Sequence, residues 1–162
     1  MEDSELLYKW ITNRDLVILN AQYHHVSEAE HLLWMESMMR CRPDSTIFVI
    51  EETALSTPIG TCQLLNINRN HRAAELQIRI GETAYHGHGY GSEAVKQLCN
   101  FGFFELHLHR IYLHVFSSNE RAIRAYQKCG FIHEGRLREA AFINGRWEDI
   151  LVMAVLNPAE SM

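Results

Sequence analysis

The chain is organised around Tyr85-His86-Gly87-His88-Gly89-Tyr90-Gly91-Ser92. Three glycines at alternate positions join a strand-like run, Glu75 to Ile80, to a helix-like run, Ser92 to Leu106. Glycine lets the backbone approach a ligand closely and adopt positive φ without steric cost. The first N–H groups of a helix have no partner within the helix and carry partial positive charge. We therefore expect the backbone from His86 to Ser92 to bind an anion.

The spacing of these glycines excludes two common phosphate-binding loops. A P-loop ends in Gly-Lys-Ser/Thr, and the dinucleotide fingerprint requires G-x-G-x-x-G. Here the third glycine, Gly91, comes one residue too early for the second pattern. From these residues alone, a glycine-rich surface turn is the alternative interpretation.

Hydrophobic periodicity on both sides of this segment predicts further helices and strands. The expected helices span Ser4 to Thr12, start at the capping box Ser27-Glu28-Ala29-Glu30, and run from the cap Asn119 to the stop at Gly130. The expected strands are Thr46 to Glu51, Ile59 to Asn66, Ala73 to Ile80, Ile111 to Phe116, Phe131 to Ile143 and Arg146 to Leu156. The turn Asn144-Gly145 predicts that the last two strands form a hairpin. Ser56, Thr57 and Pro58 are expected in a turn, and residues 13–26 in an irregular segment.

The helix that follows Ser27 is expected to pack one apolar side into the core. That side consists of Leu32, Leu33, Met35, Met38 and Met39. Methionine fills irregular gaps in cores, so we interpret the three methionines as core residues.

Helices, then a β-meander, then β-α-β-α-β-β predict a mixed α+β layer fold. A chain of 162 residues suits one domain, residues 1–162, and is long enough to bury roughly 70% of its unfolded surface.

Two motifs in this order resemble those of the GNAT N-acetyltransferase superfamily. The glycine segment resembles its Q/R-x-x-G-x-G/A motif, with His86 in place of Gln or Arg. The stretch from Asn119 to Phe131 resembles N-x-x-A-x-x-x-Y-x-x-x-G-F, with the tyrosine at Tyr126. The resemblance covers about residues 4–156 and implies a mostly antiparallel central sheet flanked by helices.

The chain departs from that family at its start. The family begins with a strand before the first helix, whereas only Met1-Glu2-Asp3 precede Ser4 here. Three residues are too few for a strand of usual length. We therefore expect the first family strand to be missing or to lie upstream, and the strand Thr46 to Glu51 to be an edge. Because apolar edges tend to pair, a second copy of the chain or a helix is expected to cover it.

The resemblance assigns acetyl-CoA as co-substrate and places it on particular residues. Backbone groups of His86, Gly87, His88, Gly89, Tyr90, Gly91 and Ser92 would hold its diphosphate. Backbone amides of Ile78, Arg79 and Ile80 would hold the pantetheine and polarise the thioester carbonyl as it gains charge.

Two side chains of the second motif complete this assignment. By resemblance, Tyr126 protonates the departing thiolate and Asn119 contacts the cofactor arm. A phenol of pKa about 10 can donate to a thiolate of pKa about 8.5. From periodicity alone, Tyr126 is also consistent with a core tyrosine, and Asn119 with a helix cap.

The acceptor amine must lose a proton before it attacks. A primary amine of pKa about 10.4 is neutral roughly one time in a thousand near pH 7.4. Glu75 is the first candidate for the base, because it precedes the end of the strand that meets the thioester and matches an acid often found there in the family. His114 on the next strand is the second candidate, and water alone is the third.

The identity of the acceptor is left open. Trp10-x-x-Asn13 resembles the ribosomal-protein alanine N-acetyltransferases, and Phe142-Ile143-Asn144-Gly145 with Asp149 resembles the spermidine N-acetyltransferases. A polyamine, an amino sugar and a protein N-terminus are therefore all candidates. We expect the acceptor groove between residues 13–26 and the hairpin of residues 139–148. A non-catalytic acetyl-CoA-binding module and an interaction protein are the alternatives to an enzyme.

Composition limits the partners and the compartment. The net charge is −5 and the chain has no Lys/Arg run, which argues against nucleic-acid binding. The ten histidines show no recognisable zinc spacing, so we expect no metal. The four cysteines form no C-x-x-C pair, and no apolar run approaches the length of a membrane span. Together these features predict a cytoplasmic protein with no membrane partner.

Overall fold

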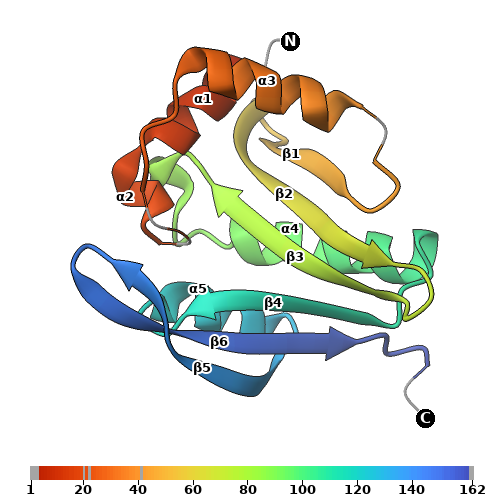
Figure 1. Cartoon of the computed structure of the whole chain (residues 1–162). Coiled ribbons are helices and arrows are strands. Elements are labelled where there is room, and N and C mark those ends of the chain that lie inside the picture. The colour runs from red at the N-terminus through yellow and green to blue at the C-terminus, as the bar shows by residue number, and fades with distance from the viewer. Residues whose placement is uncertain (1–3, 20, 22, 41, 161–162) are drawn as a thin grey trace.

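The computed structural model describes residues 4–19, 21, 23–40 and 42–160. The elements are α1 (Ser4–Thr12), α2 (Arg14–Val17), α3 (Glu28–Met39), β1 (Thr46–Glu52), β2 (Thr57–Asn68), β3 (Ala73–Ile80), η1 (Thr83–Tyr85), α4 (Tyr90–Asn100), η2 (Phe101–Glu105), β4 (Arg110–Phe116), α5 (Glu120–Lys128), β5 (Ile132–Ile143) and β6 (Arg146–Leu156). They form one mixed sheet with helices packed against it (Figure 1).

The described strands form a single sheet in the order β1-β2-β3-β4-β6-β5. Every neighbouring pair is antiparallel except β3 and β4, which run parallel. This arrangement confirms the predicted α+β class with a mostly antiparallel sheet. The residues Asn144 and Gly145 both have positive φ, as a two-residue hairpin turn between β5 and β6 requires.

The main core lies between the sheet and the helix α4. Leu64 of β2, Leu76 of β3 and Leu113 of β4 are almost fully buried against Val95 and Leu98 of α4. The alternation of apolar residues that predicted these strands therefore corresponds to the face that α4 covers. The rest of the site is built on this rigid layer.

The strands β3 and β4 separate along their length, and this separation positions the site. Their ladder pairs only Ala73–Glu75 with residues 110–112. Beyond Glu75, β3 continues to pair with β2 as far as Ile80, but it has no further pairs with β4. Figure 1 shows the two strands close at their N-terminal ends and apart at their C-terminal ends. One edge of β3 near Ile78 is therefore not used in the sheet.

Two segments are more regular than the sequence predicted. Within residues 13–26, Asn13 caps the short helix α2, because its side-chain oxygen accepts hydrogen bonds from the backbone N–H groups of Asp15 and Leu16. Thr57 and Pro58, predicted in a turn, already belong to β2. Both corrections come from local hydrogen bonds that hydrophobic periodicity does not report.

The helix predicted from Ser92 to Leu106 is two elements. It begins at Tyr90, with Gly89 as its cap, and it changes to a π-helix, η2, at Phe101. Within η2, a Cβ on Gly102 would lie 2.8 Å from Ile111 Cδ1. The glycine therefore permits close packing of this widened turn on β4.

The helix α3 differs most from expectation. Its capping box forms as predicted, since Ser27 and Glu30 each accept a hydrogen bond from the other's backbone N–H. Its predicted core side does not, because Leu32 and Leu33 are exposed, Leu33 by 66%. Among the α3 residues whose burial is described, His31 is the buried one, and its ring packs against those of Tyr8 and Trp34.

The methionines of α3 show only part of the predicted core packing. Met35 is half-buried and packs against the cluster that Leu7, Trp10 and Leu16 form. The side chains of Met38 and Met39 lie outside the described part of the structure. The apolar residues of α3 lie all around the helix, so periodicity alone does not identify its buried side.

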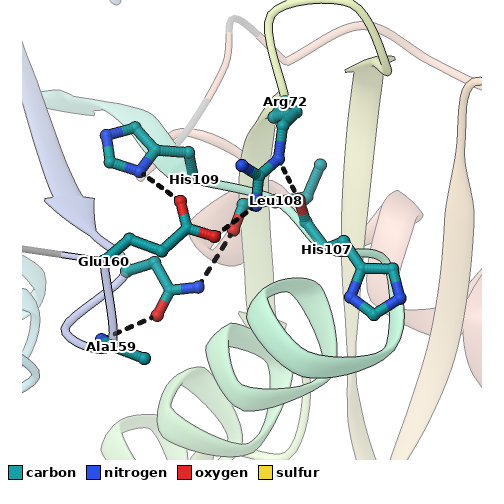
Figure 2. A network of polar contacts seen from close by, with 7 residues as sticks. Arg72, His107, Leu108, His109, Ala159 and Glu160 are labelled. Carbon is teal, nitrogen blue, oxygen red and sulfur yellow. Dashed lines mark hydrogen bonds and ion pairs between the residues drawn. The ribbon is translucent and has the colours of Figure 1, made fainter.

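The β1 edge of the sheet and the N-terminal ends of its central strands β3 and β4 have different neighbours. At one edge of the sheet, β1 pairs only with β2 among the described strands, which confirms the predicted edge position of this strand. Next to the N-terminal ends of β3 and β4, Arg72 and His109 each form a hydrogen bond with the carboxylate of Glu160 (Figure 2). These contacts fix the segment after β6 against the sheet. No helix in the described residues is long and apolar enough to cross a membrane.

Candidate functional site

A cavity of about 360 Å³, which we call the glycine-loop cavity, lies between the end of β3, the start of α4 and one side of α5. The predicted cofactor residues that line it are Ile78, Arg79, Ile80, His86, Gly87, Gly89, Gly91, Ser92 and Asn119. Tyr126 lines it as well. The predicted residues His88 and Tyr90 are not among its lining residues, and Tyr90 instead packs edge-on against Tyr85.

The glycine loop has the backbone conformation that only glycine adopts easily. Gly87 has φ of +79° and Gly89 has φ of +92°. A Cβ at either position would meet no heavy atom within 4 Å, so the backbone faces open space there. Gly89 caps α4 without any side-chain hydrogen bond, which leaves the first N–H groups of the helix available to an anion.

His86 fastens this loop to the strand. Its Nε2 lies 2.8 Å from the backbone oxygen of Ile80, and its Nδ1 lies 3.1 Å from Nη1 of Arg121. A carbonyl oxygen only accepts, so Nε2 carries the proton and Nδ1 accepts from the guanidinium. His86 therefore holds the loop against the end of β3 and orients Arg121.

Three cations of the glycine-loop cavity were not identified from the sequence. Arg121, Arg124 and Lys128 all line it from α5. Their spacing of three and four residues, which places side chains on one side of a helix, was the pattern that could have revealed them. The cavity is therefore basic although the whole chain carries a net charge of −5.

Tyr126 and Asn119 belong to the same helix but differ in their surroundings. Tyr126 is 7% exposed, and burial raises the pKa of its phenol to about 12, with a further contribution from the nearby Cys129. Its proton is therefore retained at neutral pH. Asn119 caps α5 by accepting a hydrogen bond from the N–H of Ala122, and it donates one to the backbone oxygen of Leu19.

A second cavity of about 580 Å³, which we call the N-terminal cavity, lies between α1, α3 and the strands β1 to β4. It shares three lining residues with the glycine-loop cavity, namely Ile78, Arg79 and Tyr126. The two cavities therefore meet at the part of β3 that has separated from β4. Arg79 is largely buried there, and this burial lowers the pKa of its guanidinium.

The groove that the sequence predicts for the acceptor stays a prediction, and the structure shows a cavity next to one of its two expected walls. Val17, Ala21, His24 and Val26 of the segment 13–26 line the N-terminal cavity. No residue of the hairpin 139–148 does, and the opposite wall comes from α3 and the sheet. The hairpin instead contacts α2, where Arg14 donates a hydrogen bond to the side-chain oxygen of Asn144.

Both side-chain candidates for the base lie in the N-terminal cavity. Glu75 and His114 line it, and Nδ1 of His114 lies 3.0 Å from one carboxylate oxygen of Glu75. Asn66 donates a hydrogen bond of 3.0 Å to the other oxygen. Asn66 was not identified from the sequence, because its position depends on the pairing of β2 with β3.

Metal ligands do not gather in the described residues. No group of three or more His, Cys, Asp or Glu side chains lies close enough there to hold a metal ion. Cys62 and Cys99 are buried free thiols, and burial raises their pKa to about 11 and about 12. Cys41 lies outside the described residues.

Comparison with known proteins identifies relatives for both sequence and structure. Residues 1–132 match the model of the Acetyltransferase (GNAT) domain family. The spermidine N(1)-acetyltransferase of Vibrio cholerae is 41% identical over 109 residues, which are 67% of this chain and 62% of that protein. The Escherichia coli K12 spermidine N(1)-acetyltransferase is 41% identical over 96 residues, or 59% of this chain and 51% of that protein. The chain thus matches less than two thirds of the length of either curated relative.

The similarity in structure extends further along the chain. A crystal structure of the Vibrio cholerae spermidine N-acetyltransferase, in complex with CoA and spermine, has a TM-score of 0.89 and 32% identity to this chain. The match covers 96% of this chain and 90% of that one. The family match, the order of the strands and the glycine loop at the start of α4 agree with one another. This chain belongs to the GNAT acetyltransferase domain family.

Proposed function

We propose that this chain transfers the acetyl group of acetyl-CoA to a primary amine of a polyamine, by direct attack in a ternary complex. The observation that carries the proposal is the meeting of two cavities at Ile78, Arg79 and Tyr126. One cavity has the glycine loop and, among its described residues, four cations, of which Arg79 is shared with the other cavity. That other cavity is also lined by the carboxylates of Glu30 and Glu75. An amine bound in the second is thereby brought to a thioester bound in the first.

The glycine-loop cavity suits the phosphates and the pantetheine of acetyl-CoA. The N–H groups at the start of α4 bind the diphosphate, and Arg121, Arg124 and Lys128 add positive charge. The pantetheine lies along the free edge of β3 at residues 78–80, whose backbone N–H groups polarise the thioester carbonyl. Asn119 serves this arrangement chiefly by fixing the start of α5, since its amide already has protein partners.

Proton transfers complete the reaction. Tyr126 lines both cavities and keeps its proton, so it donates that proton to the thiolate of CoA as the carbon–sulfur bond breaks. Glu75 and His114 lie on the acceptor side, where the ammonium of the substrate must lose a proton.

A polyamine is the acceptor that the N-terminal cavity favours. Glu30 and Glu75 both line it, and each keeps acceptor capacity beside its hydrogen bonds to protein groups, so their negative charge suits a substrate with more than one ammonium group. The named relatives of known structure and sequence are spermidine N-acetyltransferases. Amino sugars and protein N-termini are the competing acceptors for assay.

Assembly and location are proposed on sequence grounds. A homodimer would cover the β1 edge, and the absence of a basic run argues against a nucleic-acid partner. We also propose a cytoplasmic location with no membrane partner, from the cysteine pattern and the lack of a long apolar run.

The test is an assay of CoA thiol release with spermidine, spermine, glucosamine and an N-terminal alanine peptide, each beside calorimetric binding of acetyl-CoA. We expect the two polyamines to react fastest. Binding of acetyl-CoA without turnover of any amine would support the non-catalytic module instead. Absence of acetyl-CoA binding would favour an interaction protein and contradict the assignment of the glycine-loop cavity.

A further inference from the structure

Each carboxylate oxygen of Glu75 has a hydrogen-bond partner in the protein. One oxygen lies 3.0 Å from Nδ1 of His114, and the other accepts from the amide of Asn66 at 3.0 Å. Its side chain is only 15% exposed. A carboxylate held on both sides by donors is fixed in place and suits the role of an anchor for a neighbouring group better than that of a free base.

These contacts determine the tautomer of His114. An ionised carboxylate only accepts hydrogen bonds, so Nδ1 of His114 must carry the proton that it donates to Glu75. In the neutral imidazole the other nitrogen, Nε2, then has a free lone pair. A histidine whose one nitrogen is held by a carboxylate, while the other can accept a proton, is the arrangement that general-base catalysis uses.

The position of His114 fits this role. It follows the point at which β3 and β4 separate, and it lines the N-terminal cavity together with Tyr126. Its side chain is 39% exposed, so a proton that it accepts can pass on to water. Tyr126, by contrast, is buried and keeps its own proton.

We infer that His114 is the catalytic base that deprotonates the acceptor ammonium, and that Glu75 and Asn66 are positioning residues that hold its Nε2 toward the N-terminal cavity. This inference rests on the proposed N-acetyltransferase function. It replaces Glu75, the first candidate from the sequence, by the group that Glu75 orients.

The protons balance over one turnover. Nε2 of His114 takes one proton from the ammonium, and the neutral amine then attacks the thioester carbon to form the new carbon–nitrogen bond. As the carbon–sulfur bond breaks, Tyr126 protonates the CoA sulfur and regains a proton from the substrate nitrogen. The imidazolium, stabilised by the carboxylate of Glu75, releases its proton to solvent, which accounts for the one proton that the reaction produces.

The charges around His114 come from several elements. Glu75 and Arg79 face the cavity from β3, Tyr126 from α5, and Glu30 and His24 from α3 and the segment before it. Tyr112 of β4 packs edge-on against the His114 ring. On the neighbouring strand β6, the residue that pairs with His114 is the apolar Val152. Among these groups, Glu75 is the one within hydrogen-bond distance of an imidazole nitrogen of His114.

The tautomer is tested without any turnover. In the full-length protein labelled with ¹⁵N-histidine, the His114 ring is expected to show a protonated Nδ1 and an unprotonated Nε2 when neutral. Replacement of Glu75 by alanine should remove this preference. A neutral ring with its proton on Nε2 in the unaltered protein would overturn the inference.

The catalytic role is tested with His114→Asn, whose amide can still donate to Glu75 but has no basic nitrogen. We expect kcat/KM for spermidine to fall by about 10²-fold to 10³-fold near pH 7.4, with the Kd for acetyl-CoA unchanged. The loss should shrink to within about threefold for a fluorinated spermidine whose terminal amine is already neutral at that pH, because no proton then needs to be removed. For Glu75→Gln, kcat/KM for spermidine should also fall more than kcat/KM for the fluorinated spermidine, but both decreases should be smaller than for His114→Asn.

The matched control is His109→Asn. His109 makes the same kind of contact, from Nδ1 to a carboxylate oxygen of Glu160 at 3.1 Å, and lies at the far end of the sheet (Figure 2). It should leave kcat/KM unchanged for both substrates. Suppose that the unaltered protein acetylates spermidine. If His114→Asn then keeps the unaltered kcat/KM, or if its kcat/KM falls equally for spermidine and for the fluorinated spermidine, the inference is wrong while the proposed function stands. An unaltered protein that binds acetyl-CoA and acetylates no amine overturns both.

Discussion

Tyr126 keeps its proton well above neutral pH, because burial raises the pKa of its phenol to about 12. A tyrosine phenol in water is half ionised near pH 10. The same shift affects stability: the unfolded chain loses this proton near pH 10, whereas the folded chain holds it until about pH 12. The folded state therefore loses stability as the pH rises between these values.

Tyr126→Phe is expected to lower kcat by about 10²-fold to 10⁴-fold and to leave the Kd for acetyl-CoA unchanged, since the ring still packs but cannot donate a proton. The ratio of the two kcat values should stay constant from pH 7 to pH 10, because the phenol remains protonated throughout. Steady-state rates at several pH values, beside calorimetric titration, measure both quantities. A ratio that falls toward one by pH 10 would show that the phenol ionises early.

The sequence motifs identified some residues of the glycine-loop cavity but not its cations on α5. Tyr126 was found because it occupies a position in a recognisable motif. Arg121 was not, because its role depends on His86, which lies 35 residues away in sequence and meets it only in the folded chain.

Arg124→Gln should raise the Kd for acetyl-CoA several-fold, and the effect should diminish at high salt because phosphate contacts are screened. Arg124 lines the glycine-loop cavity, and its ion pair with Glu120 is solvent-exposed, so little stability should be lost. The control is Arg138→Gln on β5, which is not part of that cavity and should bind acetyl-CoA normally. Equal Kd values for both variants would exclude Arg124 from the phosphate site.

At the scale of elements, the start of α4 depends on one backbone conformation. Gly89 caps the helix with φ of +92°, in a region that L-residues occupy at a cost on the order of 1–3 kcal/mol. Because a Cβ there would meet only open space, the cost comes from the backbone and from whatever ligand fills that space.

Gly89→Val is accordingly expected to abolish measurable acetyl-CoA binding while the fold remains. The side chain would occupy the space in front of the helix N–H groups and disfavour the positive φ. Gly135→Ala on β5 is a matched control, since a Cβ there also meets nothing within 4 Å but φ is not positive. Circular dichroism establishes folding, and calorimetry measures the affinity. A folded Gly89→Val protein with normal affinity would exclude the loop as the anion site.

The sequence predicted the start of α3 but not the side of this helix that is buried. Its start was predicted correctly, because the capping box is a local pattern that Ser27 and Glu30 complete between themselves. Its buried side was not, because it depends on tertiary contacts that His31 makes with Ser4 and Tyr8 of α1.

Ser27→Ala should therefore lower the free energy of unfolding by about 1 kcal/mol, as the loss of an N-cap usually does. Because α3 forms one wall of the N-terminal cavity, KM for the polyamine should rise while the Kd for acetyl-CoA stays constant. Thermal denaturation and steady-state kinetics test both expectations. Unchanged stability would mean that the cap contributes little to α3.

At the scale of the whole molecule, the sequence predicted the fold well because motif order and strand periodicity are properties of the chain itself. The six strands and the family were predicted correctly. Most residues of the glycine-loop cavity were named from the sequence. The walls of the N-terminal cavity were not, since it lies where β3 stops pairing with β4 after Glu75, and no residue pattern marks that separation. No residue of the hairpin 139–148 lines the N-terminal cavity, so the groove expected between this hairpin and residues 13–26 stays a prediction.

The edge strand β1 leads to a prediction about assembly. Its outer side has no partner among the described strands, and Ile47 to Ile50 form an apolar run. We expect a second copy to cover it, so amide exchange over residues 46–51 should slow as the protein concentration rises through the dimerisation range. Sedimentation measures the mass in parallel. A soluble monomer whose outward amides exchange freely at high concentration would contradict this prediction.

Ile78, Arg79 and Tyr126 line both cavities, so one molecule can fill the two at once. A conjugate that joins the sulfur of CoA to a spermidine nitrogen through a two-carbon bridge would lose its translational freedom only once. Its second limb would act at a millimolar effective concentration and tighten binding by about 10²-fold to 10⁴-fold over the stronger limb alone. Such a conjugate would compete with both substrates, and its affinity would measure how closely the two cavities are aligned.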